Sequence, residues 1–102
     1  MRYREQNRNT HHIINSVLHL DNESTGIEVG SSSWFDWLEL QFPFYYADGH
    51  GTFHARPEQR RNGWYWYAYS RKNGKLHKRY MGKAEKLTNR HLGLICKRLD
   101  RA

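Results

Sequence analysis

The chain has 102 residues, a length that fits one domain with one small core. Its 17 lysines and arginines outnumber its 10 aspartates and glutamates, and the resulting formal net charge of +7 indicates a polyanionic partner. The single cysteine, Cys96, excludes an internal disulfide and a multi-cysteine zinc site, and no apolar stretch approaches the roughly 20 residues of a membrane span. We therefore expect a cytoplasmic protein with no membrane partner.

The first 24 residues are mostly polar, and we expect them to form an N-terminal arm before a single sheet-plus-helix domain over residues 25–102. Within this arm, "IINSVLHL" places Ile13, Ile14, Val17 and Leu18 at helix-like spacing. The patch suits a short helix or strand docked on the domain, or a segment that contacts a partner.

The stretch "SSSWFDWLEL", residues 31–40, predicts a short Trp-rich helix. Ser33 is placed to cap its first turn, with Asp36 at the spacing of a capping box. Trp34, Trp37 and Leu38 then share one face of the helix, which predicts that this face is buried.

Residues 42–56 predict a β-hairpin, because two extended runs flank Asp48-Gly49 and both residue types tolerate the backbone of a tight reversal. Pro57 cannot donate a ladder hydrogen bond, so we expect the second strand to end there. The following "RPEQRRNG" is predicted to be a polar loop.

The second hairpin is the strongest short-range signal in the chain: Asn73-Gly74 separates "WYWYAYSR" from "LHKRYMG". A two-residue turn at Asn73-Gly74 sets Tyr67 opposite Tyr80 and Trp66 opposite Met81.

After Gly82 the apolar residues recur at helical spacing, and Thr88 marks the boundary of a final amphipathic helix; these residues are Leu87, His91, Leu92, Leu94, Ile95 and Leu99. The predicted fold is α+β. It is a three- to four-stranded antiparallel meander packed on the C-terminal helix, with the short Trp-rich helix before the sheet.

Strand alternation assigns the side chains of the second hairpin to two faces. One face carries small and apolar residues that suit a helix crossing the sheet: Trp64, Trp66, Ala68 and Met81, with Phe53 and Ala55 from the preceding strand. The other carries phenols and cations: Tyr65, Tyr67, Tyr69, Arg71, Leu76, Lys78 and Tyr80, with His54 and Arg56. Phenols need hydrogen-bond partners when buried, so the second face is predicted to be a solvated contact surface for a partner and not a closed core. The alternative is that Tyr67 and Tyr80 are ordinary cross-strand partners covered by the N-terminal segment.

The stretch "GTFHARPEQRRNGWYWYAYSRKNGKLHKRYMGKAEKLT", preceded by "SWFDWLELQFPF", resembles a small domain of bacterial LuxR/MalT-like regulators and of stand-alone proteins of cyanobacteria and Chloroflexi. The resemblance covers about residues 26–99. In architecture it is similar to the arm-type DNA-binding domains of integrases and to plant GCC-box-binding domains, which place a three-stranded sheet in the DNA major groove. The resemblance implies DNA contacts from Arg56, Tyr65, Tyr67, Tyr69, Arg71, Lys78 and Tyr80. Unlike integrases, the chain is not expected to include a catalytic domain, and it carries more Tyr and fewer Arg on the sheet than the plant domains.

We therefore expect a non-catalytic DNA-binding protein that serves transcription control or a mobile-element complex, with duplex DNA as its partner. Phosphate contacts are expected from Arg60, Arg61, Lys72, Lys75, Lys78 and Arg79. Groove contacts or base stacking are expected from Arg56, Tyr67, Tyr69 and Arg71. The same aromatic and basic face also suits an RNA-binding module or an adaptor within a larger protein complex.

Catalytic and metal chemistry find little support in the sequence. His50 and His54 lie four apart on a predicted strand, where this spacing does not bring two ligands together as it does on a helix. The acidic residues are scattered, and no nucleophile and base form a known motif. We expect no catalytic residue, no metal site and no cofactor.

Overall fold

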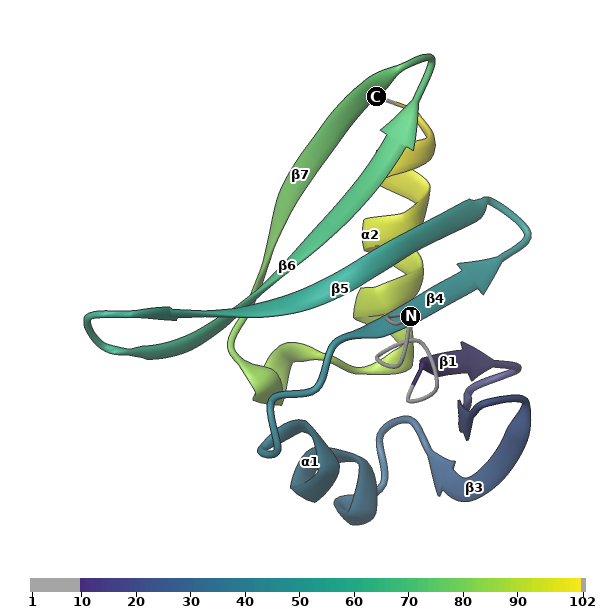
Figure 1. The fold of residues 1–102 in the computed structure, drawn as a ribbon, viewed down its shortest axis with the longest axis vertical. Helices are drawn as coiled ribbons and strands as arrows, with labels where there is room; N and C mark the ends of the chain where they lie inside the picture. The colour runs from purple at the N-terminus through teal and green to yellow at the C-terminus, as the bar shows by residue number, and fades with distance from the viewer. Residues whose placement is uncertain (1–9, 102) are drawn as a thin grey trace, which may run out of the picture.

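The computed structural model describes residues 10–101 and shows one sheet of seven strands in the order β3-β2-β1-β4-β5-β6-β7 (Figure 1). The described residues also form two α-helices and one short 3-10 helix. The α+β class fits this architecture, but the expected count of three to four strands is not confirmed. Residues 1–9 of the predicted arm lie outside the described residues. Within residues 10–101, neither helix is long and apolar enough to cross a membrane.

Three N-terminal strands account for the additional width of the sheet: β1 (His11–Ile14), β2 (Val17–Leu20) and β3 (Glu23–Glu28). The "IINSVLHL" patch, for which a docked helix, a docked strand or a partner-binding segment was considered, forms the two strands β1 and β2. Both connecting turns have two residues with positive φ, Asn15-Ser16 and Asp21-Asn22, as primed hairpin turns require. β1 then runs parallel to β4, with His12 beside Tyr45, so the sheet is mixed.

Helix α1 (Ser32–Leu38) begins two residues earlier than its predicted cap implied. Ser31 is extended and its hydroxyl accepts a hydrogen bond from the Trp34 amide at 3.2 Å. The expectation of Ser33 as the cap is wrong, because Ser33 already lies inside the helix. The predicted buried face of Trp34, Trp37 and Leu38 is confirmed.

The first predicted hairpin consists of β4 (Phe44–Asp48) and β5 (Gly51–Arg60), and β5 runs through Pro57 to Arg60. The expected loop after Arg56 is therefore wrong. The pairing of β5 with β4 ends at Ala55, so at Pro57 its only paired neighbour is β6, and Pro57 lies opposite Trp66. Proline is tolerated at such a local edge because one side of the strand requires no donor.

The second hairpin consists of β6 (Gly63–Lys72) and β7 (Lys75–Gly82), joined by Asn73-Gly74 as predicted, with φ of 52° and 79°. Tyr67 pairs with Tyr80, also as predicted. The expected partner of Trp66 is wrong: a bulge shifts the register, and Trp66 lies opposite Gly82. Met81 is the extra residue on β7.

The 3-10 helix η2 (Ala84–Lys86) leads into α2 (Asn89–Asp100), whose N-cap is Thr88 at the predicted boundary. Helix α2 buries its apolar stripe against the sheet: Leu92, Ile95, Cys96 and Leu99. Burial raises the pKa of the Cys96 thiol to about 12, as suits a core cysteine. Leu94, predicted to join the stripe, is 41% exposed.

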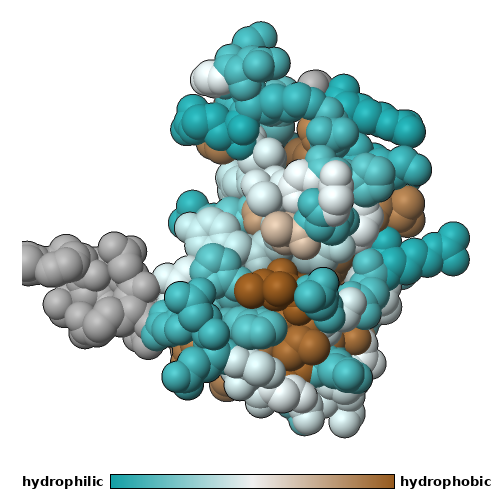
Figure 2. Space-filling model, turned by 90° about the vertical axis from the view of Figure 1, so that its right-hand side faces the viewer, coloured by the Kyte–Doolittle hydropathy of each residue, from teal (hydrophilic) through white to brown (hydrophobic). Residues whose placement is uncertain are grey.

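The core lies between the sheet and the two helices. Trp34 of α1 contacts Phe44 with its ring at 5.4 Å and donates from Nε1 to the Leu87 carbonyl at 2.8 Å, which joins α1 to the segment before α2. The flank of the molecule in Figure 2 is mostly hydrophilic, and its most extended apolar area lies in the lower half. Both helices lie on one side of the sheet, because Trp34 and Trp37 of α1 contact Phe44 and α2 contacts β4, β5 and β7.

Candidate nucleic-acid interface

Alternation along β6 separates the two faces of the sheet. Trp66 and Ala68 are fully buried beside Phe53 and Ala55 of β5, as predicted, and they form the face that the helices cover. The opposite side of β5–β7 carries the predicted phenols and cations, and we call it the tyrosine face: Arg56, Glu58, Arg60, Tyr65, Tyr67, Tyr69, Arg71, Leu76, Lys78 and Tyr80.

Helix α2 lies behind β5–β7 in Figure 1, so the tyrosine face is turned toward the viewer, and α1 lies below these strands. Tyr80 is 55% exposed, whereas Tyr65, Tyr67 and Tyr69 are half-buried by their neighbours on the face. Within residues 10–101, therefore, these phenols are not sealed beneath another element.

One row of side chains crosses five strands on this side of the sheet. The strand register places His12, Tyr45, His54, Tyr69 and Lys78 next to one another in that order. The Tyr45 ring stacks on His54 at 4.2 Å and on His12 at 5.2 Å. The tyrosine face thus continues across β4 to β1 as an aromatic surface.

Cations lie over the phenol rings in the centre of the tyrosine face. The Lys78 ammonium is 4.4 Å from the centre of the Tyr67 ring and 5.5 Å from that of Tyr69. The Arg60 guanidinium lies 5.3 Å from the Tyr67 ring, and that of Arg56 lies 5.5 Å from the Tyr69 ring. Cation–π attraction orients these side chains along the sheet.

Glu58 supplies a carboxylate at the centre of this cluster. It accepts hydrogen bonds from the Tyr69 hydroxyl, from Arg60 and, at 3.3 Å, from Lys78. The Tyr69 hydrogen bond, with those of Lys78 and Arg60, lowers the pKa of Glu58, and the hydrogen bonds that the Lys78 ammonium donates to Tyr69 and Glu58 raise the pKa of Lys78. Glu58 therefore stays ionised at neutral pH and partly neutralises the cations beside it.

His54 sits between Tyr45 and Tyr69 in the row, half-buried. Burial, and then the positive charge of Arg56, lower the pKa of its imidazole. At neutral pH His54 is thus an uncharged stacking ring.

The remaining predicted phosphate contacts are more dispersed. Arg61 lies in the β5–β6 turn, while Arg71 and Lys75 lie near the β6–β7 turn, all three exposed. Lys72 donates to the Asp100 carbonyl at the C-terminus of α2, where the helix dipole favours a cation. Arg79 pairs with buried Ala68, and alternation places it on the covered side. The structure therefore does not bring Lys72 and Arg79 to the tyrosine face.

Glu58, Tyr45 and His12 also belong to this surface, although they were not predicted from the sequence. Glu58 is two residues beyond Arg56, so alternation through Pro57 places it beside the tyrosines once β5 is known to continue. Tyr45 lies opposite His54 in the first hairpin, and that register was within reach of the sequence. The position of His12 depends on a parallel pairing that no local signal indicates.

Fold and site together define an α+β protein with helices on one side of its sheet and a surface of phenols and cations on the other. Comparison of the chain with family models, curated proteins and solved structures finds no match. The resemblance to LuxR/MalT-like and integrase arm-type domains stays a prediction from the sequence. Among residues 10–101, no three His, Cys, Asp or Glu side chains gather as metal ligands.

Proposed function

We propose that the protein binds duplex DNA through the tyrosine face, as part of transcription control or a mobile-element complex. The observation that carries the proposal is the combination of partly exposed phenols with four cations, Arg56, Arg60, Arg71 and Lys78, on the side of the sheet opposite the helices. Cations hold phosphates regardless of sequence, and planar or hydroxyl groups contact the groove.

The geometry of two neighbouring strands supports this proposal. The major groove is about 12 Å wide and admits a two-stranded β-ribbon. β6 and β7 form such a ribbon, and the β5–β6 turn, with Arg61 at its tip, projects from the body of the molecule in Figure 1. A ribbon in the groove would leave Arg60 and Arg61 near the adjacent phosphates.

A fluorescence anisotropy titration tests the proposal with a labelled duplex, the same strand unpaired, and RNA of the same sequence, at several salt concentrations. Four phosphate contacts predict a log–log slope of roughly −3.5 for the duplex. Lys78→Ala should reduce the slope by about 0.9, because one contact is lost. Lys97→Ala is the matched control, because it removes the same charge from the exposed side of α2.

Three results would change the proposal. Tighter binding of RNA or of the single strand would replace duplex DNA by an unpaired nucleic acid as the partner. Binding that disappears near physiological salt for all three probes would favour an adaptor that meets an acidic protein surface. Equal losses in Lys78→Ala and Lys97→Ala would show that the attraction is not localised to the tyrosine face.

A further inference from the structure

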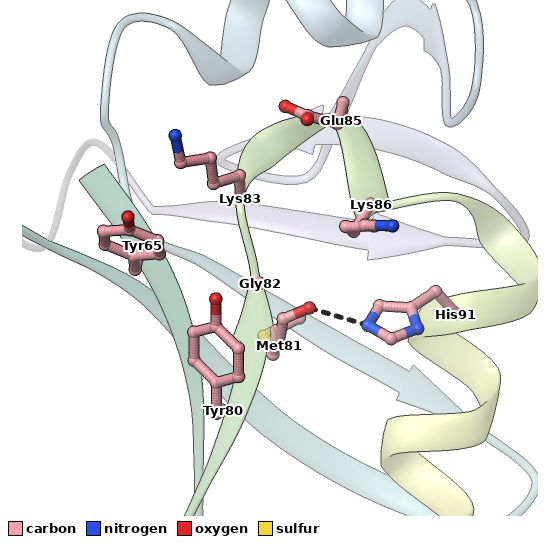
Figure 3. A pocket seen from close by; sticks show the side chains of 8 residues that line it. All are labelled: Tyr65, Tyr80, Met81, Gly82, Lys83, Glu85, Lys86 and His91. Atoms are coloured by element: carbon pink, nitrogen blue, oxygen red, sulfur yellow. Dashed lines mark hydrogen bonds between the residues drawn. The ribbon is translucent and has the colours of Figure 1, made fainter. Parts of the chain in front are cut away.

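A pocket of about 570 Å³ lies where the end of β7 meets η2 and the start of α2 (Figure 3). Its volume is within the range of roughly 300–1,000 Å³ that small-molecule sites occupy. Tyr65 and Tyr80 form one wall, so the pocket opens at the edge of the tyrosine face.

Two phenol rings give this wall a planar, apolar surface with polar ends. The rings of Tyr65 and Tyr80 are 6.1 Å apart and tilted by 41°. In Figure 3 both hydroxyls point toward the Lys83 end of the pocket. A flat ligand would pack on the exposed Tyr80 ring and meet hydroxyl groups at one end.

Among the described residues, the two lysines that border the pocket have no carboxylate partner. Lys83 and Lys86 are both exposed, and neither forms an ion pair within residues 10–101. The Lys83 ammonium lies 5.5 Å from the centre of the Tyr65 ring. Glu85 also lines the pocket but is paired with neither lysine. In contrast to the Glu58 cluster, this pocket keeps unpaired cations that a bound anion would neutralise.

Another wall of the pocket is formed where His91 of α2 contacts the end of β7. His91 Nε2 is 2.7 Å from the Met81 carbonyl oxygen, the hydrogen bond drawn in Figure 3. Gly82 has a φ of +108°, and a Cβ on it would lie 3.1 Å from Lys86 Cγ. Because Gly82 has no side chain, the Lys86 stem can pack there. In Figure 3 the Lys86 ammonium points away from Lys83, on the His91 side of the pocket.

We propose that this pocket binds a nucleoside monophosphate unit, with its base on the Tyr80 ring and its phosphate near Lys83, while Lys86 adds positive charge on the His91 side of the pocket. The inference rests on the proposed function and deepens it, because the unit would be an unpaired, 5′-phosphorylated nucleotide at the end of a DNA strand. A free nucleotide has the same chemistry, and the two sources are separated by the experiment.

The experiment uses the full chain and two pairs of probes. The first pair is AMP and adenosine, measured by calorimetry. The second is a blunt duplex without 5′-phosphates and a duplex of equal nucleotide count that carries a 5′-phosphorylated three-nucleotide overhang, measured by anisotropy. We expect AMP to bind at least tenfold more tightly than adenosine, and the overhang duplex about tenfold more tightly than the blunt one.

Two double variants locate the effect. Lys83→Ala/Lys86→Ala should abolish both preferences, and Lys97→Ala/Arg98→Ala, which removes the same charge from the exposed side of α2, should preserve them. A preference for AMP without one for the overhang supports the pocket and identifies a free nucleotide as its ligand. If the unmodified chain binds AMP but no duplex, the proposed DNA function is overturned, and the proposed nucleotide site in the pocket is still supported.

The proposal itself is overturned if AMP binds no better than adenosine and the overhang adds nothing. It is equally overturned if both preferences survive in Lys83→Ala/Lys86→Ala. In either case, the salt slope of the blunt duplex still reports separately on the tyrosine face.

Discussion

Strand β6 presents two chemically different faces within ten residues. Trp66 and Ala68 are completely buried, whereas their neighbours Tyr67 and Tyr69 remain half-exposed on the opposite side. The covered face combines a large ring with a small side chain, which lets α2 approach the sheet. The tyrosine face bears phenols and charges, whose polar atoms require water or a partner. Both faces are aromatic, so polarity rather than ring content separates core from surface here.

The tyrosine face itself is uneven. At its centre Glu58 binds Arg60 and Lys78, while at its edge Lys83 and Lys86 have no carboxylate partner among the described residues. The centre is therefore held in place by its own ion pairs, and the edge is better suited to a new anion.

The largest expected effect comes from placing a carboxylate on each face of β7. Met81 is 2% exposed, so Met81→Asp should lower the free energy of unfolding by about 4 kcal/mol or more, since a buried charge would lack a partner. Its matched control is Tyr80→Asp, on the adjacent residue of the open side, which should cost about 1 kcal/mol. Urea unfolding followed by circular dichroism measures both. If Tyr80→Asp were the more damaging, the two faces would be wrongly assigned.

Truncation of neighbouring rings on β6 should give the next largest difference. Trp66→Ala should destabilise the fold by about 3–5 kcal/mol, because it leaves a cavity against Phe44 and the helices. Tyr67→Ala should cost about 1 kcal/mol, since its ring loses contacts with Tyr80 and Lys78 but leaves no closed cavity. The same denaturant titration applies. Similar losses for the two variants would indicate that the tyrosine face is also core.

Glu58→Gln sharpens the contrast within the tyrosine face. The amide frees Arg60 and Lys78 from their counter-charge, so we expect duplex affinity to rise by a few fold. Anisotropy at two salt concentrations measures the change, with Glu23→Gln on β3 as the control for charge alone. A weaker affinity in Glu58→Gln would mean that the carboxylate positions the cations productively.

The smallest expected effect is a loss of stability in mild acid. Burial lowers the pKa of His11, which packs on Trp37 with ring centres 4.9 Å apart, and burial also lowers that of His54. Unfolded His binds its proton near pH 6.5, so the unfolded chain takes up more protons as the pH falls below that value. The unfolding free energy should be fully present above pH 6.5 and decrease between pH 6.5 and 5.

Denaturant titrations across this pH range measure the slope in the unmodified chain, in His11→Phe and in His54→Phe. Each variant should reduce the slope of the unfolding free energy against pH by the contribution of the histidine that it removes. An unchanged slope in both variants would mean that neither ring is kept neutral by the fold.

Several features of the fold followed from local patterns alone. Asn73-Gly74 determined the β6–β7 turn, and alternation then assigned Tyr67, Tyr69 and Lys78 to one face. The N-cap at Thr88 and the buried residues of α2 followed from helical periodicity. The same local logic failed at Pro57, because its tolerance depends on where the neighbouring strand β4 ends.

The sequence by itself determined the basic charge, the two hairpins, the C-terminal helix and the separation of phenols from the apolar face, because each depends on residues close together along the chain. Only the tertiary structure decided that residues 11–28 extend the sheet, that β1 joins β4 in parallel, and that Lys83, Lys86 and Tyr80 border one pocket. Those features arise from contacts between distant segments, whose formation reflects the competition of all strands and helices for the same buried surface.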